Sequence, residues 1–588
     1  MDRTRLPYAR PGIALPVVLF AMLAVGAIAT AAALLNANAV LIHTFDERQS
    51  VLEAAADAGL EEARARLNGN PDLYPDTGFV VLERDAPVLD ARGRPIPNVR
   101  RSVYVGPTGV TTGQYGVFGS IVVEAVDAGG ARVVRRAEIT DQSFARFAYF
   151  TDEEPSNIAF GGGDQIFGPV HTNDVLKIYD SGATFHGPVT TAETISGVGY
   201  GDFRQGYEEG VARIPMPETE DLEKLRDLAE AGDLDFSGSM AGSSSQATLR
   251  IEFDTIGDHG FIKVYQSNDP AWVTADVPYD YWRGLENSEN CGHYEKDGTF
   301  RSAADHGRGD PHSWEAALRN GGRCYLGGSD SLFGGFVPDD GNGRWLRWPG
   351  QPADIAVDAG RADAAYLFPI SRAYNPDFKG VIFVEGKVAV SGVVRGHVTL
   401  AATGDIIIVD DLEYATDPGA ADRNCADGDV TNDDILGLFS GDDVIVANNT
   451  INAPTDPDDD NAWDNDFVSF DDTPEEVIHA TILALSEFTV DDYDSGAWST
   501  ERCEGKMWGR GCLYLTGGVI QKRRGAVGAI RDPGGYGYLK RYSYDQCVRT
   551  SPPPFFPTTG HFTRGHVFEV DPNGFDVAEY FRLLTAGS

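Results

Sequence analysis

The chain has 588 residues, with 48 Lys and Arg against 89 Asp and Glu, and a formal net charge of −41 at pH 7. Such a surface repels nucleic acid and anionic lipid, which argues against a nucleic-acid-binding function, and it attracts divalent cations. The apolar content is that of a globular protein, so the acidity does not indicate disorder. The length predicts two to four domains, and the 68 glycines and 32 prolines indicate an all-β body rich in turns.

The first predicted element is an apolar helix from Ile13 to Leu35, a run without a single charged side chain. At about 1.5 Å of rise per residue, this run spans the hydrocarbon core of a bilayer. Arginines precede it and acidic residues follow it, so the positive-inside rule keeps residues 1–12 in the cytoplasm. We therefore expect a single-pass inner-membrane protein whose body is periplasmic or extracellular.

Gly12 stands at the junction between this basic leader and the apolar run. A short basic leader, a glycine and an apolar helix resemble a type IV prepilin, in which a leader peptidase cuts after the glycine. The resemblance implies processing between Gly12 and Ile13, and other pilins and the pilus assembly platform as partners. Val17 stands where major pilins carry Glu, which resembles the minor pilins of the PilX type and implies a place at the filament tip. An ordinary membrane anchor also lacks that Glu, because a charge is costly in lipid.

After the apolar run the pattern becomes amphipathic and predicts that one helix continues to Leu67. The residues of the predicted buried stripe recur at helical spacing: Phe45, Leu52, Ala56, Leu60, Ala63 and Leu67. Asn68-Gly69-Asn70-Pro71 then ends the helix. Four β-rich segments follow between residues 78 and 140, and they predict a small antiparallel sheet that covers the stripe. A 13–67 helix packed on a sheet within residues 68–146 resembles the pilin fold.

The remaining chain, residues 147–588, is predicted to be a β-rich exported body. Gly168-Pro169-Val170 and Gly187-Pro188-Val189 are 19 residues apart, a spacing that suits one coil of a β-solenoid. Beyond residue 379, short β-branched runs with little hairpin chemistry predict parallel stacking, as in a β-helix, and a sandwich is the alternative. A short helix is expected from Glu218 to Ala231. Residues 240–375 are interpreted as inserted loops.

Several runs of the body resemble a bacterial family of unknown function with a PilX-like N-terminus and a β-rich exported body. These runs are FGPVHTND, GVIFVEGKVAVSGVVRGHVTLAATGDIII, ILGLFSGDDVIV and the late YLKRYSYDQ…PPPFFP. The resemblance covers most of the chain and implies no known activity.

The six cysteines contain no C-x-x-C pair, which argues against a zinc site and, in an exported chain, indicates disulfides. Cys503 with Cys512 is the best local pair, because the two close a glycine-rich loop. The second predicted pair is Cys291 with Cys324, and this leaves Cys425 with Cys547.

A dense acidic group is the best predicted binding site, because calcium takes six to eight oxygen ligands. Its residues are Asp456, Asp458, Asp459, Asp460, Asp464 and Asp466. A solvated acidic loop is the alternative interpretation. His171 and His186 share the repeat context, where a paired histidine site competes with ordinary polar positions of the stack.

The chain contains no nucleophile elbow, phosphate-binding loop, zinc-protease motif or dinucleotide fingerprint. The sequence therefore predicts a non-enzymatic minor pilin-like subunit, and calcium is the one candidate cofactor. A membrane-tethered β-helix enzyme acting on polysaccharide is one alternative, and it would show a groove with clustered acids or a basic residue. A surface adhesin that never enters a pilus is the other.

Overall fold

The computed structural model describes residues 14–75, 77–108, 116–267, 270, 292–294, 300–302, 338–339, 343–419, 434–447, 476–494, 502–531, 534–549 and 551–586. The chain forms two compact units. Unit 1 holds Met1–Val110, Phe118–Thr140 and Phe562–Ser588, and unit 2 holds Thr111–Val117 and Asp141–His561. The sequence-based boundary assigned residues 562–588 to the body. These 27 residues fold with unit 1 instead.

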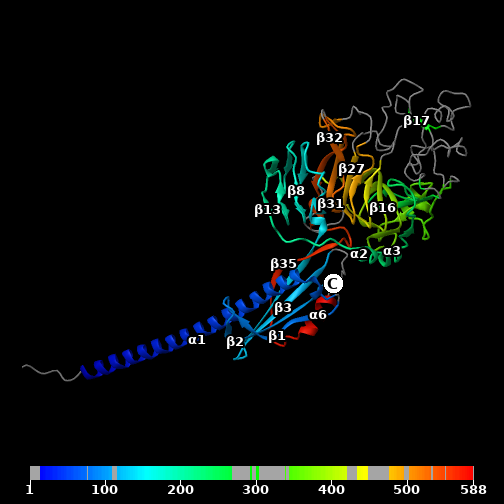
Figure 1. The fold of residues 1–588 in the computed structure, drawn as a ribbon. Helices are drawn as coiled ribbons and strands as arrows, with labels where there is room; N and C mark the ends of the chain where they lie inside the picture. The colour runs from blue at the N-terminus through cyan, green and yellow to red at the C-terminus, as the bar shows by residue number, and fades with distance from the viewer. Residues whose placement is uncertain are drawn as a thin grey trace, which may run out of the picture. The chain divides into compact units, whose positions relative to one another are not determined.

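Unit 1 is built on one long helix, α1 (Ala14–Gly69), which agrees with the predicted helix. Its first half is exposed, and its second half is buried along the predicted stripe from Leu52 to Leu67. The prediction is wrong for Phe45, which is 64% exposed. Figure 1 shows the helix extending well past the strands of its own unit, and Phe45 belongs to the exposed part of this helix.

The sheet of unit 1 has the order β1-β2-β3-β4-β35, and its first four strands are antiparallel as predicted. The strands are β1 (Val80–Leu89), β2 (Pro95–Pro107), β3 (Phe118–Asp127), β4 (Arg132–Ser143) and β35 (Thr558–Val570). Side chains alternate between the faces of a strand, so Val123 faces α1 at Gly59 while Val122 packs with Phe581. Phe581 belongs to α6 (Val577–Ala586), so the sheet is covered by α1 on one face and by α6 on the other.

Charged residues join α1 to this sheet. The buried Arg101 on β2 pairs with Glu62 of α1 and, at 2.8 Å, with Glu83 of β1. Arg135 on β4 binds Asp57 of α1 at 2.7 Å. These pairs lie along the second half of α1, where the sheet excludes part of the surrounding water.

Unit 2 begins with short strands that stack in parallel, coil upon coil (Figure 1). The first row is β5 (Tyr149–Glu153), β7 (Val170–Thr172), β10 (Val189–Thr191) and β13 (Tyr207–Glu209). The second row is β6 (Asp164–Phe167), β9 (Ala183–Phe185) and β12 (Gly201–Phe203), and β8 (Leu176–Lys177) pairs with β11 (Ile195–Ser196). Val170 pairs with Val189, so the predicted 19-residue stacking of the Gly-Pro-Val motifs is confirmed.

The later strands of unit 2 form a second set of parallel rows. One row is β14 (Asp235–Ser237), β21 (Val381–Glu385), β23 (His397–Ala402), β25 (Ile435–Ser440), β27 (Glu476–Ala484) and β31 (Cys512–Arg523). The other is β15 (Leu249–Ile256), β22 (Val388–Val394), β24 (Ile406–Tyr414), β26 (Val444–Val446) and β28 (Phe488–Val490). The parallel pairing predicted beyond residue 379 is therefore present.

The two sets of rows join through strands from opposite ends of unit 2. β31 pairs in parallel with β5, and β34 (Leu539–Tyr544) pairs in parallel with both β31 and β6. We call this meeting of β5 and β6 with β31 and β34 the junction. The first strands of unit 2, β5 and β6, therefore lie in the middle of the stack. The last strands, β31 and β34, return to pair with them.

Two expectations for unit 2 are corrected. The region interpreted as inserted loops contains β15, which stacks on β22, and its hairpin partner β16 (His259–Ser267), joined through Gly257 and Asp258. The alternating apolar and polar residues of these strands are the signal that was missed. The helix expected at 218–231 is two short helices, α2 (Thr219–Glu223) and α3 (Arg226–Glu230), which bury Leu222 and Ala229.

Smaller elements complete the described chain. Besides β15, the antiparallel partners of β16 are β19 (Gly343–Trp345) and β20 (Phe368–Pro369). The others are α5 (Asp354–Asp358), β17 (Gly292–Tyr294), β18 (Phe300–Ser302), β29 (Arg502–Cys503), β30 (Lys506–Met507), β32 (Gly528–Arg531) and β33 (Gly534–Gly537).

Gly187→Ala should destabilise unit 2 by about 1–3 kcal/mol, because overpacking a filled site forces backbone shifts. A Cβ at Gly187 would lie 2.0 Å from the carbonyl oxygen of Gly168 in the coil below. Gly199→Ala is the matched control, since a Cβ there meets nothing within 4 Å. Urea unfolding of the detergent-solubilised chain measures both variants, and equal stabilities would contradict the close stacking of the two motifs.

Candidate functional site

Most of the sequence-predicted site residues lie outside the described part of the chain. They are the processing residues Gly12 and Ile13, the six acidic residues Asp456, Asp458, Asp459, Asp460, Asp464 and Asp466, and the cysteines Cys291, Cys324 and Cys425. The predicted processing site and calcium loop therefore remain predictions.

One predicted disulfide is confirmed. Cys503 and Cys512 are bonded, with their Cα atoms 4.7 Å apart, and both side chains are buried beside Trp508. Cys547 is also disulfide-bonded. This covalent chemistry agrees with an exported body in an oxidising compartment.

The two histidines of the repeat have different partners. His171 is buried, and its ring nitrogens lie 2.8 Å from Thr190 Oγ1 and 3.0 Å from Asn173 Oδ1. Burial lowers the pKa of His171, which favours the neutral ring. His186 instead stacks on Phe167, with ring centroids 3.9 Å apart. Each histidine thus occupies its own polar position of the stack.

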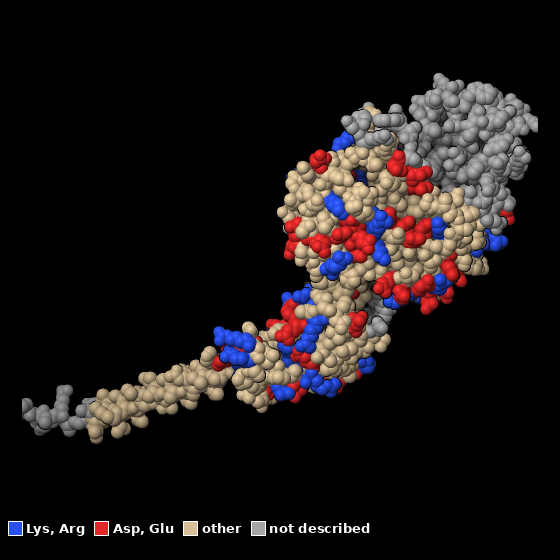
Figure 2. Space-filling model, viewed as in Figure 1, with Lys and Arg blue, Asp and Glu red and all other residues tan. Residues whose placement is uncertain are grey.

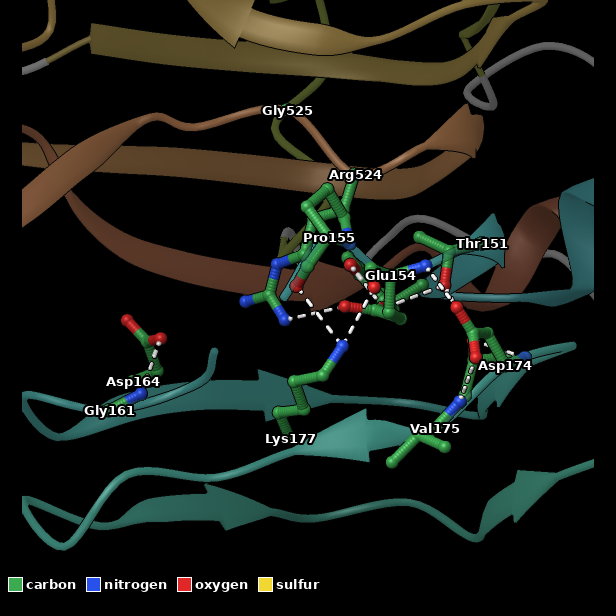
Figure 3. Close-up of polar contacts among 12 residues, drawn as sticks. Thr151, Glu154, Pro155, Gly161, Asp164, Asp174, Val175, Lys177, Arg524 and Gly525 are labelled. Carbon is green, nitrogen blue, oxygen red and sulfur yellow. Dashed lines mark hydrogen bonds and ion pairs between the residues drawn. The ribbon is translucent and has the colours of Figure 1, made fainter. Parts of the chain in front are cut away.

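A group of buried charges lies at the junction (Figure 3). We define the junction cluster as Glu154, Asp164, Arg524 and Lys540. Arg524 Nη1 lies 3.1 Å from Glu154 Oε2, and both side chains are almost fully buried. Lys540 Nζ lies 3.3 Å from Asp164 Oδ2. Glu154 and Asp164 come from the first coil of the stack and Arg524 and Lys540 from the last, so both ion pairs cross the junction.

Hydrogen bonds hold the carboxylate of Glu154 in place. Tyr149 and Thr151 donate to its Oε1 at 3.1 and 2.7 Å. Lys177, in the neighbouring coil, donates to the backbone oxygens of Glu154 and Pro155 at 2.7 and 3.1 Å, as Figure 3 shows. Glu154 is therefore held both at its carboxylate and at its backbone.

The interior around these charges is aromatic. The guanidinium of Arg524 lies 3.9 Å from the centre of the Phe160 ring, and Lys540 Nζ lies 5.6 Å from it. Burial lowers the pKa of Lys540, and the charge of Arg524 lowers it further against the opposing effect of Asp164. Burial also lowers the pKa of Arg524, but Tyr149 and Glu154 raise it by more, so the guanidinium stays charged. The pKa of Arg524 is thus raised and that of Lys540 is lowered, so Lys540 loses its proton more readily than Arg524 does.

A second charged group lies on the outer turns of the stack. Among the described residues, Asp405, Asp442 and Asp443 form a group of three whose carboxylate oxygens lie within 4.8 Å of one another. Lys387 Nζ already lies 2.8 Å from Asp405 Oδ2. Burial raises the pKa of Asp442, and the neighbouring Asp405 and Asp443 add to the effect. This group is adequately explained as a lysine-neutralised acidic turn.

A cavity of about 670 Å³ lies among β14, β19 and β20. Its lining combines charged and aromatic side chains, among them Asp233, Asp235, Arg344, Arg347, Tyr366 and Phe368. Burial raises the pKa of Asp235. The volume lies within the range of small-molecule sites, and such a lining offers partners for a hydroxyl-rich ligand.

Sequence reasoning missed the junction cluster and this cavity. Glu154 and Arg524 are 370 residues apart, and no local motif marks either of them. Asp235 lies just before the region interpreted as loops, and the two arginines of the lining lie inside it. The alternation of β15 and β16 was the signal that would have placed those residues beside a sheet.

Comparisons with known proteins give little further information. No family model matches the chain, and no curated protein is significantly similar to it in sequence. A solved structure, the competence-associated pilin ComZ from Thermus thermophilus, aligns with 88% of this chain and 96% of its own. The identity is 13% and the TM-score is 0.24, a value too low to carry an argument about fold or function.

Glu154→Gln should destabilise unit 2 by about 3–5 kcal/mol, because it leaves the buried charge of Arg524 without a carboxylate. Asp202→Asn is the matched control, since it breaks the exposed Arg204–Asp202 pair and should cost no more than about 1 kcal/mol. Urea unfolding followed by tryptophan fluorescence compares the two variants. A loss for Glu154→Gln as small as that of the control would show that the junction does not depend on this pair.

Proposed function

We propose that the chain is a non-enzymatic minor pilin-like subunit of a type IV pilus or a related secretion or adhesion assembly, at or near its tip. One observation carries the proposal. The second half of α1 packs on a sheet of its own unit, whereas its first half, from Leu15 to Phe45, is exposed and apolar. Figure 2 shows no Lys, Arg, Asp or Glu along that half.

An exposed apolar helix of this length needs lipid or other apolar helices around it. In the described part of the chain, α1 is long and apolar enough to cross a membrane. A pilin-like helix uses both environments in turn, first the bilayer and then the core of a filament. α1 is exposed along its first half and packed on a sheet along its second half. This arrangement fits a pilin-like subunit better than a plain membrane anchor, because an anchor does not need to continue as one helix into the folded unit.

Val17 supports a place at the tip. It lies on the bare half of α1 and is 57% exposed, so it offers neighbouring helices an apolar surface and no carboxylate. In the pilin-like interpretation, a subunit without that carboxylate is not drawn in beneath a neighbour. It is instead the uppermost subunit, with its freed N-terminus available to the next one below.

The body is then the displayed part. We interpret its parallel rows as a β-solenoid, whose regular stacking resists shear and proteolysis outside the cell. The acidic loop of residues 456–466 is proposed to hold calcium there. The net charge of −41 keeps such a body soluble and away from anionic surfaces.

The cavity favours ligand binding as a second role. Charged residues on its lining, such as Asp235 and Arg344, lie beside the aromatic Tyr366. This is the grouping of acids and bases expected of a polysaccharide-active or adhesive body. Ligand binding is compatible with a subunit at a pilus tip. If the chain does not enter a pilus, the same binding site fits the two alternatives, a membrane-tethered enzyme and a surface adhesin.

The leader peptidase should remove residues 1–12, so N-terminal sequencing of the membrane-bound protein should begin at Ile13. Gly12→Val should block the cut, because the peptidase site needs a small residue, while Gly26→Val, within α1, should leave it unchanged. An intact Met1 in cells that process their major pilin would refute the pilin-like reading and favour a permanently tethered protein.

A further inference from the structure

Lys540 and Asp164 meet inside the junction although they are 376 residues apart. The parallel register pairs Arg541 of β34 with Gln165 of β6, which places Lys540 directly opposite Asp164 on neighbouring strands. Both side chains point into the interior, and Nζ lies 3.3 Å from Oδ2. Backbone pairing that begins at the next residue of each strand therefore holds an amine close to a carboxyl group.

The surroundings disfavour the charged form of Lys540. Phe160, Tyr149 and Tyr542 are buried around the two groups, and an apolar interior disfavours separated charges. The lowered pKa of Lys540 agrees with this setting. Transfer of one proton from Nζ to Asp164 gives an amine and a carboxylic acid, which are the nucleophile and the electrophile of an acyl transfer.

The carboxyl group of Asp164 also lies beside hydrogen-bond donors. The backbone N–H of Gly161 donates to Oδ2 at 3.1 Å. Nη2 of Arg524 is buried and has no hydrogen-bond partner among the described residues. In Figure 3 the end of the guanidinium that is not bonded to Glu154 points toward Asp164. Donors placed in this way stabilise the negative oxygen that forms when a carboxyl carbon is attacked.

We propose that Lys540 and Asp164 become joined by an intramolecular amide bond. Nζ of the neutral lysine attacks Cγ of the protonated Asp164, and the N–C bond forms as the C–OH bond breaks. The departing hydroxyl takes one proton from the nitrogen and leaves as water, so the reaction needs no oxidant, metal or cofactor. Fixed proximity and the escape of water from an apolar interior drive it forward.

The bond would close the stack covalently where its first and last coils meet. β6 and β34 are held by a short backbone ladder, and an amide between them prevents their separation under load. The inference does not rest on the proposed function, because it depends only on contacts inside unit 2.

The chain contains its own control. Lys387 lies 2.8 Å from Asp405, a closer contact than that of Lys540 with Asp164. Lys387 lies beside a group of three carboxylates, and no described aromatic ring lies over it. It should therefore stay an ion pair, and trypsin should cleave after it.

Tryptic peptide mapping of the purified full chain by mass spectrometry tests the bond. We expect residues 147–177 and 532–541 to be recovered as one branched species, lighter than the sum of the two linear peptides by one water, about 18 Da. Cleavage after Lys387 should be normal in the same digest. Lys540→Arg keeps the charge but removes the amine, and it should return both regions as linear peptides. Linear peptides and cleavage after Lys540 in the unmodified protein would overturn the proposal.

Discussion

The bare half of α1 imposes the main constraint on this protein. Each large apolar side chain kept in water costs about 1.5–3 kcal/mol relative to burial, and the helix presents such side chains on all sides. Its sheet cannot cover them, because the strands begin only where the helix turns amphipathic. The fold of unit 1 therefore leaves one end of its central helix to be buried by something else.

The transition along α1 is abrupt and is set by charge. From Arg48 onward the helix carries residues that pair with the sheet, including Arg48 with Asp127 and Asp57 with Arg135. Buried alanines and leucines between these residues allow close approach to β3. The same helix is thus an apolar rod at one end and an ordinary amphipathic packing element at the other.

In unit 2 the corresponding constraint is the junction. A stack that starts in its middle has free strand edges on β5 and β6 until β31 and β34 reach them. Free edges pair readily with wrong partners, so a specific closure is needed. The opposite charges of Glu154 and Arg524 match only in one register, and a slip by one residue would bury an unpaired charge.

The sequence predicted those elements whose signal is local. The stripe from Leu52 to Leu67 repeats at helical spacing, the Gly-Pro-Val motifs repeat at coil spacing, and Cys503 lies close to Cys512. Each of these predictions was confirmed. Phe45 continued the pattern of the stripe, but whether a strand reaches it depends on tertiary structure that no local pattern records.

Apart from β15 and β16, whose local alternation was overlooked, the failures come from distance along the chain. β5 and β31 pair although they are more than 360 residues apart in the sequence, and no residue pattern in either strand identifies the other as its partner. The cavity likewise gathers residues from β14 and from β19 that lie about a hundred positions apart. The return of β35 and α6 to unit 1 is of the same kind, since nothing in their composition distinguishes them from the body.

Site-specific photo-crosslinking from the bare half of α1 tests the central claim most directly. A photoreactive residue in place of Leu23, which is 62% exposed, should form crosslinks to other pilin-like subunits in sheared filaments. The same residue in place of Leu52, which is buried against its own sheet, should give no intermolecular product. Crosslinks from position 23 to lipid alone, with the whole chain retained in the membrane fraction after shearing, would contradict a role in a filament.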